Sequence, residues 1–60
     1  MNMNVDMNMN YEYEVQGNYG YGWDLLTTEN TLADAITQKE CYDENEPNVP
    51  HRIRKVYYEV

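Results

Sequence analysis

The chain of 60 residues carries 11 acidic and 4 basic side chains, which gives a net charge of −7, and it has one cysteine and one histidine. A chain of this length forms one domain with a small hydrophobic core. A single cysteine excludes an internal disulfide, and one cysteine with one histidine cannot complete a closed zinc site, so we expect no metal or cofactor. The acidic balance disfavours direct contact with nucleic acid and with anionic membranes.

The acidic charge is concentrated in one part of the sequence. Residues 1–50 contain ten acids and one base, a net charge of −9, whereas residues 51–60 contain three bases and one acid, a net charge of +2. This distribution suits a basic partner, or serves only solubility. No stretch is long and apolar enough for a transmembrane helix, and no signal peptide is visible, so we expect a cytoplasmic protein.

Residues 1–10 are rich in alternating methionine and asparagine. One interpretation is a disordered leader, since asparagine is a poor strand former and chain termini are usually loose. The other is a backward extension of the first strand that presents a flexible methionine stripe to a partner. The general behaviour of termini favours the leader, which leaves residues 11–60 as the folded domain.

Residues 11–26 predict a β-hairpin. Apolar and polar side chains alternate with period two around a glycine-rich centre, which is typical of two half-buried strands joined by a turn. We expect strands at 11–17 and 22–26, with an apolar face formed by Tyr11, Tyr13, Val15, Trp23 and Leu25. Trp23 is expected to lie buried between the hairpin and the following helix, near Leu32 and Ile36.

A helix is predicted from about residue 28 to about residue 44. Thr27 or Thr28 can cap its first turn, and Asn45 in a left-handed conformation, followed by Pro47, can end it. Cys41 falls on the solvent side, and no neighbouring positive charge predicts a reactive thiol there. The inward stripe of this helix is formed by Leu32, Ala35, Ile36 and Lys39.

Residues 52–60 predict a third strand rich in isoleucine, valine and tyrosine. Val56 and Tyr58 share one face and Ile53 lies on the other, so a bulge near Arg54 is needed if Ile53 also reaches the core. His51 is expected to be a loop residue with local hydrogen bonds. Together these elements predict an α+β fold, a two-layer β-β-α-β domain with strand order 2-1-3 and one helix over one face of the sheet.

Four short strings carry a resemblance: YxVQGNYGxGW at 13–23, LTxE at 26–29, YDENEP at 42–47 and HRI at 51–53. They resemble a family of small proteins carried by bacteriophages and prophages, over roughly residues 11–56. The resemblance implies a phage origin and implies no particular chemistry. Members of that family usually carry more basic residues in the helix than this chain does.

The sequence favours a binding protein over an enzyme. An enzyme would need an acid, a base or a nucleophile that converge in a cleft, and the sequence shows no such set. A domain this thin also has little room for a pocket of about 300 Å³ or more. In size and charge the chain is similar to anti-CRISPR and anti-restriction proteins, which suggests a non-catalytic inhibitor that binds a basic surface of a host protein or nucleoprotein complex. The side chains expected to make this contact are Asp34, Glu40, Asp43, Glu44 and Glu46 of the helix, with Tyr19 and Tyr21 as aromatic anchors.

The alternative is a phage accessory or regulatory interaction protein without nucleic-acid mimicry, whose acidity only keeps it soluble. Both functions place the protein in the cytoplasm of a bacterial host cell. A monomer or a weak homodimer fits either of them.

Overall fold

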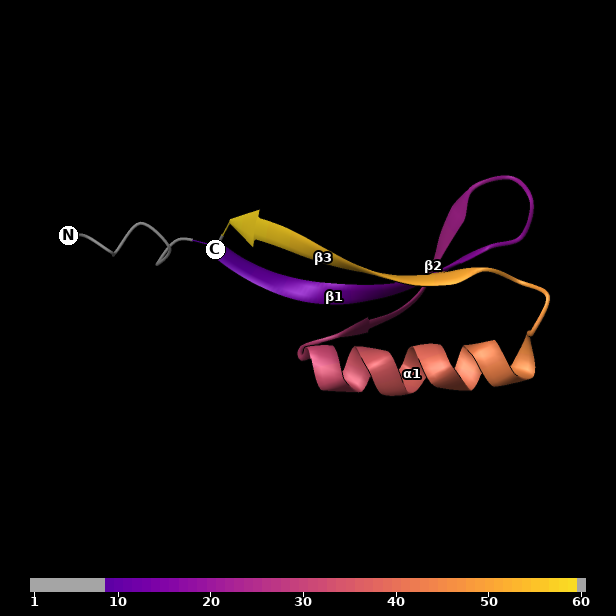
Figure 1. Ribbon diagram of the computed structural model, residues 1–60. Coiled ribbons are helices and arrows are strands. Elements are labelled where there is room, and N and C mark those ends of the chain that lie inside the picture. The colour runs from indigo at the N-terminus through magenta and orange to yellow at the C-terminus, as the bar shows by residue number, and fades with distance from the viewer. Residues whose placement is uncertain (1–8, 60) are drawn as a thin grey trace.

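The computed structural model describes residues 9–59, which form β1 (Met9–Asn18), β2 (Trp23–Glu29), α1 (Leu32–Asn45) and β3 (His51–Glu59) (Figure 1). The strands form one antiparallel sheet in the order β2-β1-β3. The α+β class, the β-β-α-β connectivity and the strand order predicted from the sequence are therefore confirmed. The expected leader at 1–10 lies mostly outside the described residues, although β1 already begins at Met9.

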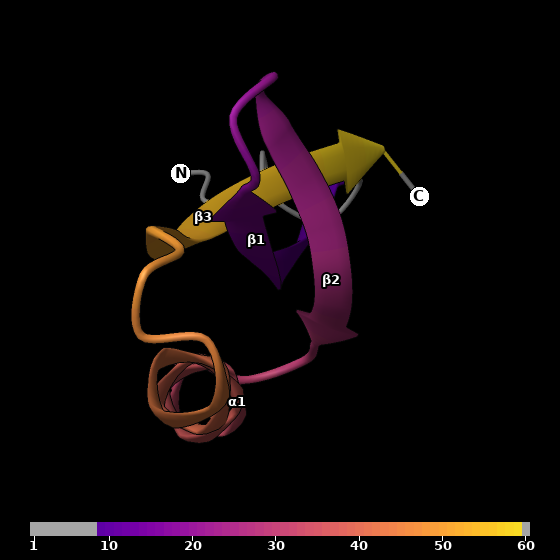
Figure 2. The same ribbon diagram turned by 90° about the vertical axis from the view of Figure 1, so that its right-hand side faces the viewer.

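Helix α1 covers only part of one face of the sheet. Figure 2 shows the helix nearly end-on at one side, and no helix or strand of the described chain lies on the other side. Residues 9–12 of β1 pair with residues 56–59 of β3 and have no partner in β2. This two-stranded ribbon extends past the beginning of the helix (Figure 1).

A lysine surrounded by tyrosine rings orders the ribbon. The Lys55 ammonium nitrogen lies 4.1 Å from the ring centroid of Tyr11 and 5.2 Å from that of Tyr57. The Tyr11 and Tyr57 rings meet edge to face with their centroids 5.9 Å apart. Cation–π and aromatic contacts thus replace a hydrophobic core in a region that the helix does not cover.

The pairing of β1 with β3 has no register shift. Val15 lies opposite Ile53, so both side chains point to the helix side, while Val56 and Tyr58 point to the other side. The bulge expected near Arg54 is wrong, because β3 brings Ile53 to the core without any irregularity. The same regularity places Val56 and Tyr58 on the side away from the helix, whereas Tyr57 shares the side of Ile53 and Lys55.

A bulge occurs in β2 instead. Val15 lies opposite Thr27, whereas Gln16 lies opposite Leu25, so Leu26 is an extra residue on β2. The extra residue reverses the alternation of the strand, so Leu25 and Trp23 share the face of Gln16 rather than that of Val15.

Because of this reversal, Trp23 lies on the side of the sheet that faces away from the helix. Its side chain is 38% exposed, and the guanidinium carbon of Arg52 lies 4.1 Å from the centroid of its ring. The expectation that Trp23 is buried beside Leu32 and Ile36 is wrong. Leu32 and Ile36 are themselves 48% and 43% exposed.

Helix α1 begins later than predicted because β2 continues through Glu29. The capping residue is Thr31, whose hydroxyl accepts a hydrogen bond from the backbone amide of Asp34 at 3.1 Å. Thr27 and Thr28, the caps expected from the sequence, belong to the strand.

The hydrophobic core is very small. Val15 and Ala35 are the buried hydrophobic side chains of the described residues, one from the central strand and one from the helix. Larger apolar and aromatic side chains remain at least partly exposed: Tyr11, Tyr19, Tyr21, Trp23, Leu25, Leu32, Ile36, Tyr57 and Tyr58. A domain with so little buried apolar surface depends on its polar contacts, on partners, or on both.

Replacement of Thr27 by valine is expected to stabilise the domain. The Thr27 hydroxyl is buried and makes no hydrogen bond within the described residues, and a buried unsatisfied hydroxyl costs about 1–3 kcal/mol. Valine has nearly the same shape, so Thr27→Val should raise the melting temperature in a thermal melt followed by circular dichroism. Thr28→Val, at an exposed position of the same strand, is the control and should change it little; a lower melting temperature for Thr27→Val would contradict the assignment.

Candidate functional site

The acidic side chains of α1 divide into two groups. Asp34, Glu40 and Glu44 are exposed, and none of them forms an ion pair within residues 9–59. Glu40 and Glu44 are one turn apart, on the side of the helix that faces away from the buried Ala35. These three carboxylates are available to the cations of a partner.

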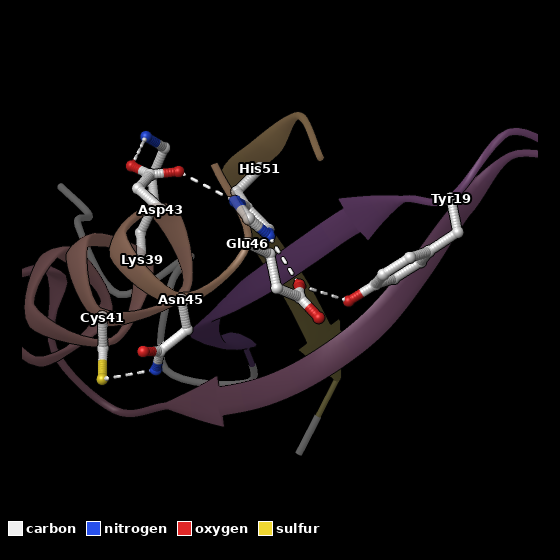
Figure 3. Close-up of polar contacts among 7 residues, drawn as sticks. All are labelled: Tyr19, Lys39, Cys41, Asp43, Asn45, Glu46 and His51. Carbon is white, nitrogen blue, oxygen red and sulfur yellow. Dashed lines mark hydrogen bonds and ion pairs between the residues drawn. The ribbon is translucent and has the colours of Figure 1, made fainter. Parts of the chain in front are cut away.

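Asp43 and Glu46 point instead at His51 (Figure 3). Asp43 Oδ1 lies 2.8 Å from His51 Nδ1, and Glu46 Oε1 lies 3.0 Å from His51 Nε2. The His51 side chain is 0% exposed. A buried imidazole therefore lies between two carboxylates, with one at each ring nitrogen.

Two further side chains complete this arrangement. The Tyr19 hydroxyl donates a hydrogen bond to Glu46 Oε1 at 2.7 Å, and the Lys39 ammonium donates one to Asp43 Oδ2 at 2.8 Å. Five residues are joined in this way, and we call them the His51 cluster: Tyr19, Lys39, Asp43, Glu46 and His51 (Figure 3). The cluster connects the turn after β1, the end of α1 and the beginning of β3.

The end of the helix brings these side chains together. Helix α1 ends at Asn45, and the backbone amide of Glu46 donates a hydrogen bond to the carbonyl of Tyr42 at 2.7 Å. The left-handed ending expected at Asn45 is wrong, because no non-glycine residue among those described has a positive φ. Pro47 then prevents continuation of the helix, and a short loop returns the chain to His51.

Gly17 makes room for the imidazole. It lies opposite His51 in the pairing of β1 with β3. A Cβ atom at Gly17 would lie 3.2 Å from His51 Cδ2 and 3.1 Å from both Leu26 Cδ1 and Tyr19 Cε2, which is tighter than ordinary contact. The glycine is required here by close packing within a strand rather than by the conformation of a turn.

The turn between β1 and β2 holds the second predicted aromatic anchor. Gly20 and Gly22 adopt φ angles of 110° and 128°, which strongly favour glycine. Tyr21 lies between them and is 77% exposed, and its hydroxyl donates a hydrogen bond to Asp24 Oδ2 at 2.9 Å. Of the two predicted anchors, Tyr21 presents a free ring, whereas Tyr19 is tied to Glu46.

The two carboxylates favour a proton on His51. Burial of the ring is the largest single influence and by itself lowers the pKa of His51, but the hydrogen bonds and charges of Glu46 and Asp43 together leave it raised above 6.5. Hydrogen bonds from Lys39 and then from His51 lower the pKa of Asp43. Those from His51 and then from Tyr19 lower the pKa of Glu46, and the hydrogen bond to Glu46 raises the pKa of Tyr19 to about 12.

The geometry gives the His51 cluster a structural role. Both nitrogens of the buried imidazole are occupied by carboxylates, and the Tyr19 hydroxyl is directed at Glu46. Cys41 is exposed, as expected, and its sulfur lies 3.8 Å from Asn45 Nδ2. Among the described residues, no group of three or more histidine, cysteine or acidic side chains is placed to hold a metal ion. The cluster thus acts as a clamp made of hydrogen bonds and ion pairs.

Sequence reasoning predicts His51 only as a loop residue, whereas it is the first residue of β3 and its side chain is buried. Its partners Asp43 and Glu46 lie eight and five residues earlier in the chain. The one signal in the sequence is this spacing across a proline-containing loop. It becomes informative only once the helix is known to end at Asn45 and the chain is known to reverse there.

The face of the sheet opposite α1 carries a second polar network. Arg52 Nε donates a hydrogen bond to Gln16 Oε1 at 2.7 Å, and Gln16 Nε2 donates one to Glu14 Oε1 at 2.7 Å. The Arg52 guanidinium also stacks on Trp23. We call this surface the open sheet face; strand alternation assigns to it Glu12, Glu14, Gln16, Trp23, Leu25, Arg52, Arg54, Val56 and Tyr58.

No protein-family model, no curated protein and no solved structure matches the chain. Within the described residues, none of the helical structure is long and apolar enough to cross a membrane. The function is therefore inferred from the sequence and from the geometry of three features: the exposed acidic side of α1, the open sheet face and the His51 cluster.

The His51 cluster predicts a stability that depends on pH on both sides of a maximum. A raised histidine pKa stabilises the fold fully below the ordinary value of 6.5, and this contribution is lost as the pH rises through the raised value. The lowered pKa values of Asp43 and Glu46 stabilise the fold above their ordinary values of 3.8 and 4.5, and this contribution is lost as the pH falls through the lowered values. The cluster should therefore stabilise the protein most at mildly acidic pH.

The measurement is the melting temperature from about pH 6 to about pH 9, for the wild type and for His51→Gln. Glutamine can form a hydrogen bond but does not titrate, so the variant should lose less stability than the wild type over this range. Equal losses in the two proteins would show that His51 does not gain its proton affinity from the two carboxylates.

Proposed function

We propose that the protein is a small non-catalytic binding protein that attaches the exposed acidic side of α1 to a basic surface of a host complex and thereby inhibits it. The observation that carries the proposal is the set of exposed carboxylates on Asp34, Glu40 and Glu44, which form no ion pair within residues 9–59. Carboxylates in this state retain their full attraction for the lysine and arginine side chains of a partner.

The basic side chains of the protein also support a partner with a basic surface, because most of them already make internal contacts. Lys39 is paired with Asp43, Lys55 lies over the Tyr11 ring, and Arg52 is held between Trp23 and Gln16. Most of the positive charge is therefore engaged in internal contacts, while the acidic side of the helix is not neutralised. This balance opposes direct binding of nucleic acid and favours a basic protein surface.

The partner class that we propose is a host defence complex that handles nucleic acid, of the CRISPR or restriction type. A surface that normally holds phosphates is basic, and exposed carboxylates can occupy it in their place. The resemblance of the sequence to phage proteins supports a partner in the bacterial cytoplasm. Tyr21, exposed in the turn after β1, is the aromatic side chain best placed to add an anchor.

The set of residues proposed for contact is smaller than the set predicted from the sequence. Asp43 and Glu46 engage His51, and Tyr19 engages Glu46, so these three side chains are partly committed to the fold. A contact that recruited them would have to break the His51 cluster. We therefore assign binding to Asp34, Glu40 and Glu44.

A second candidate function is that of a phage accessory or regulatory interaction protein. The observation that favours it is the exposure of Trp23, Leu25 and Tyr58 on the open sheet face, since these side chains suit a protein contact that does not use carboxylates. In that case the acidity of the helix serves solubility alone.

Charge reversal on the helix separates the two functions. The variant Glu40→Lys with Glu44→Lys should weaken binding to the host complex by roughly tenfold or more and should abolish inhibition, since opposite charges at the contact become like charges. The control variant, Glu29→Lys with Glu59→Lys, changes the net charge equally but lies outside α1, and it should bind nearly as the wild type does.

The readouts are the titration of purified CRISPR effector and restriction complexes with the protein at increasing salt, and phage plating on bacteria that carry those systems. Inhibition at a fixed stoichiometric ratio that weakens with salt is the expected result. Binding that is insensitive both to salt and to the helix variant would contradict the electrostatic mechanism. Absence of inhibition for all such complexes would leave the accessory function.

A further inference from the structure

The open sheet face combines exposed apolar side chains with an ordered polar centre. Trp23, Leu25 and Tyr58 are 38%, 56% and 45% exposed, while Gln16 between them is only 7% exposed and is hydrogen-bonded to Arg52. The face therefore has fixed side chains at its centre and uncovered apolar area at its margins. This combination is typical of a protein interface.

The small core gives a reason for such an interface. Of the hydrophobic side chains that the structure describes, only Val15 and Ala35 are buried completely. Such a core gives little hydrophobic stabilisation, and small domains commonly gain the remainder by association. The helix side already has its covering element, whereas the open sheet face has none within the described residues. Association through the open sheet face would cover the second face of the sheet.

The charges of this face identify the kind of partner. Glu12 and Glu14 form an acidic row on β1, and Arg52 and Arg54 form a basic row beside it on β3. The two rows cancel, so the open sheet face contributes nothing to the net charge of −7. It is therefore the large surface over which two copies of this acidic chain repel each other least.

One charge of each row, Glu14 on β1 and Arg54 on β3, can form an ion pair across an interface. Glu14 lies opposite Arg54 in the register of β1 with β3, yet no ion pair joins these two side chains in the described structure. An acidic row beside a basic row is self-complementary under a two-fold rotation, because the rotation exchanges the rows.

We propose that a second copy of this chain packs on the open sheet face and forms a two-fold symmetric dimer with two stacked sheets. A two-fold axis that runs parallel to the strands, between β1 and β3, places β1 of each copy over β3 of the other. Glu14 then faces Arg54 of the other copy, and Gln16 faces Arg52. The two sheets lie about 10 Å apart, as in other face-to-face sheet packings.

This arrangement accounts for both the polar centre and the apolar margin of the open sheet face. The Gln16–Arg52 network lies at the centre of the interface with its hydrogen bonds already formed, and Trp23 and Leu25 cover the margin beside β3 of the other copy. Both α1 helices face outward, so the dimer presents two identical acidic surfaces. The dimer does not depend on the proposed inhibition, since it uses the opposite face of the sheet.

The test is the molecular mass of the full chain in solution, by analytical ultracentrifugation over a range of concentrations. The wild type should show a mass twice that of one chain. Leu25→Glu should reduce it to that of one chain, whereas Leu32→Glu, at a leucine of similar exposure on the helix, should leave the dimer intact. A wild type that stays monomeric at all concentrations, or that forms larger assemblies, would overturn the proposal.

Charge exchange tests the symmetry itself. Glu14→Arg and Arg54→Glu, each alone, should be monomeric because each places like charges across the interface. An equimolar mixture of the two variants should recover the dimer mass, since each copy then supplies the charge that the other lacks. The double variant in one chain should dimerise by itself, and its circular dichroism melt shows that both positions tolerate exchange. The proposal would be overturned if the single variants still formed dimers. It would also be overturned if their mixture stayed monomeric while the double variant folds.

Discussion

Within residues 9–59, a single helix covers only part of one face of the three-stranded sheet (Figure 2). The other contacts of the described structure reflect that constraint. Among the described residues, the buried hydrophobic side chains are Val15 and Ala35, where the central strand and the helix face each other. Beyond this point the elements must be joined by other means, namely a cation within tyrosine rings along the ribbon and the His51 cluster at the end of the helix.

The His51 cluster compensates for the missing core because it joins segments that the hydrophobic contacts do not reach. Two carboxylates from the end of the helix meet one imidazole from the beginning of β3, and a tyrosine from the turn after β1 meets one of those carboxylates. A buried imidazole with both nitrogens hydrogen-bonded is a satisfied polar group. It therefore fixes geometry at the edge of a core too small to do so by packing.

Sequence patterns were sufficient where one local rule decides the outcome. The period-two alternation from Tyr11 to Val15 predicts β1, and Pro47 predicts the end of the helix, so the order of elements along the chain follows from local patterns. The patterns failed where the outcome depends on how one strand pairs with another strand. The extra residue Leu26 in β2 moves Trp23 to the other face of the sheet, and the longer β2 moves the helix cap to Thr31. Neither shift leaves a mark in the hydrophobic pattern, because both depend on how β2 pairs with β1.

The protonation of His51 links the stability of the fold to the charge of its acidic surface. With the proton present, both ring nitrogens donate, and His51 and Lys39 together offset the charges of Asp43 and Glu46. The exposed negative charge of the helix is then carried by Asp34, Glu40 and Glu44. When the proton leaves, the neutral ring has a single donor, so one carboxylate loses its hydrogen bond and the helix end gains a full negative charge. That charge lies on the side chains that close the end of α1. The pH range in which the His51 cluster carries the most negative charge is therefore also the range in which it stabilises the fold least.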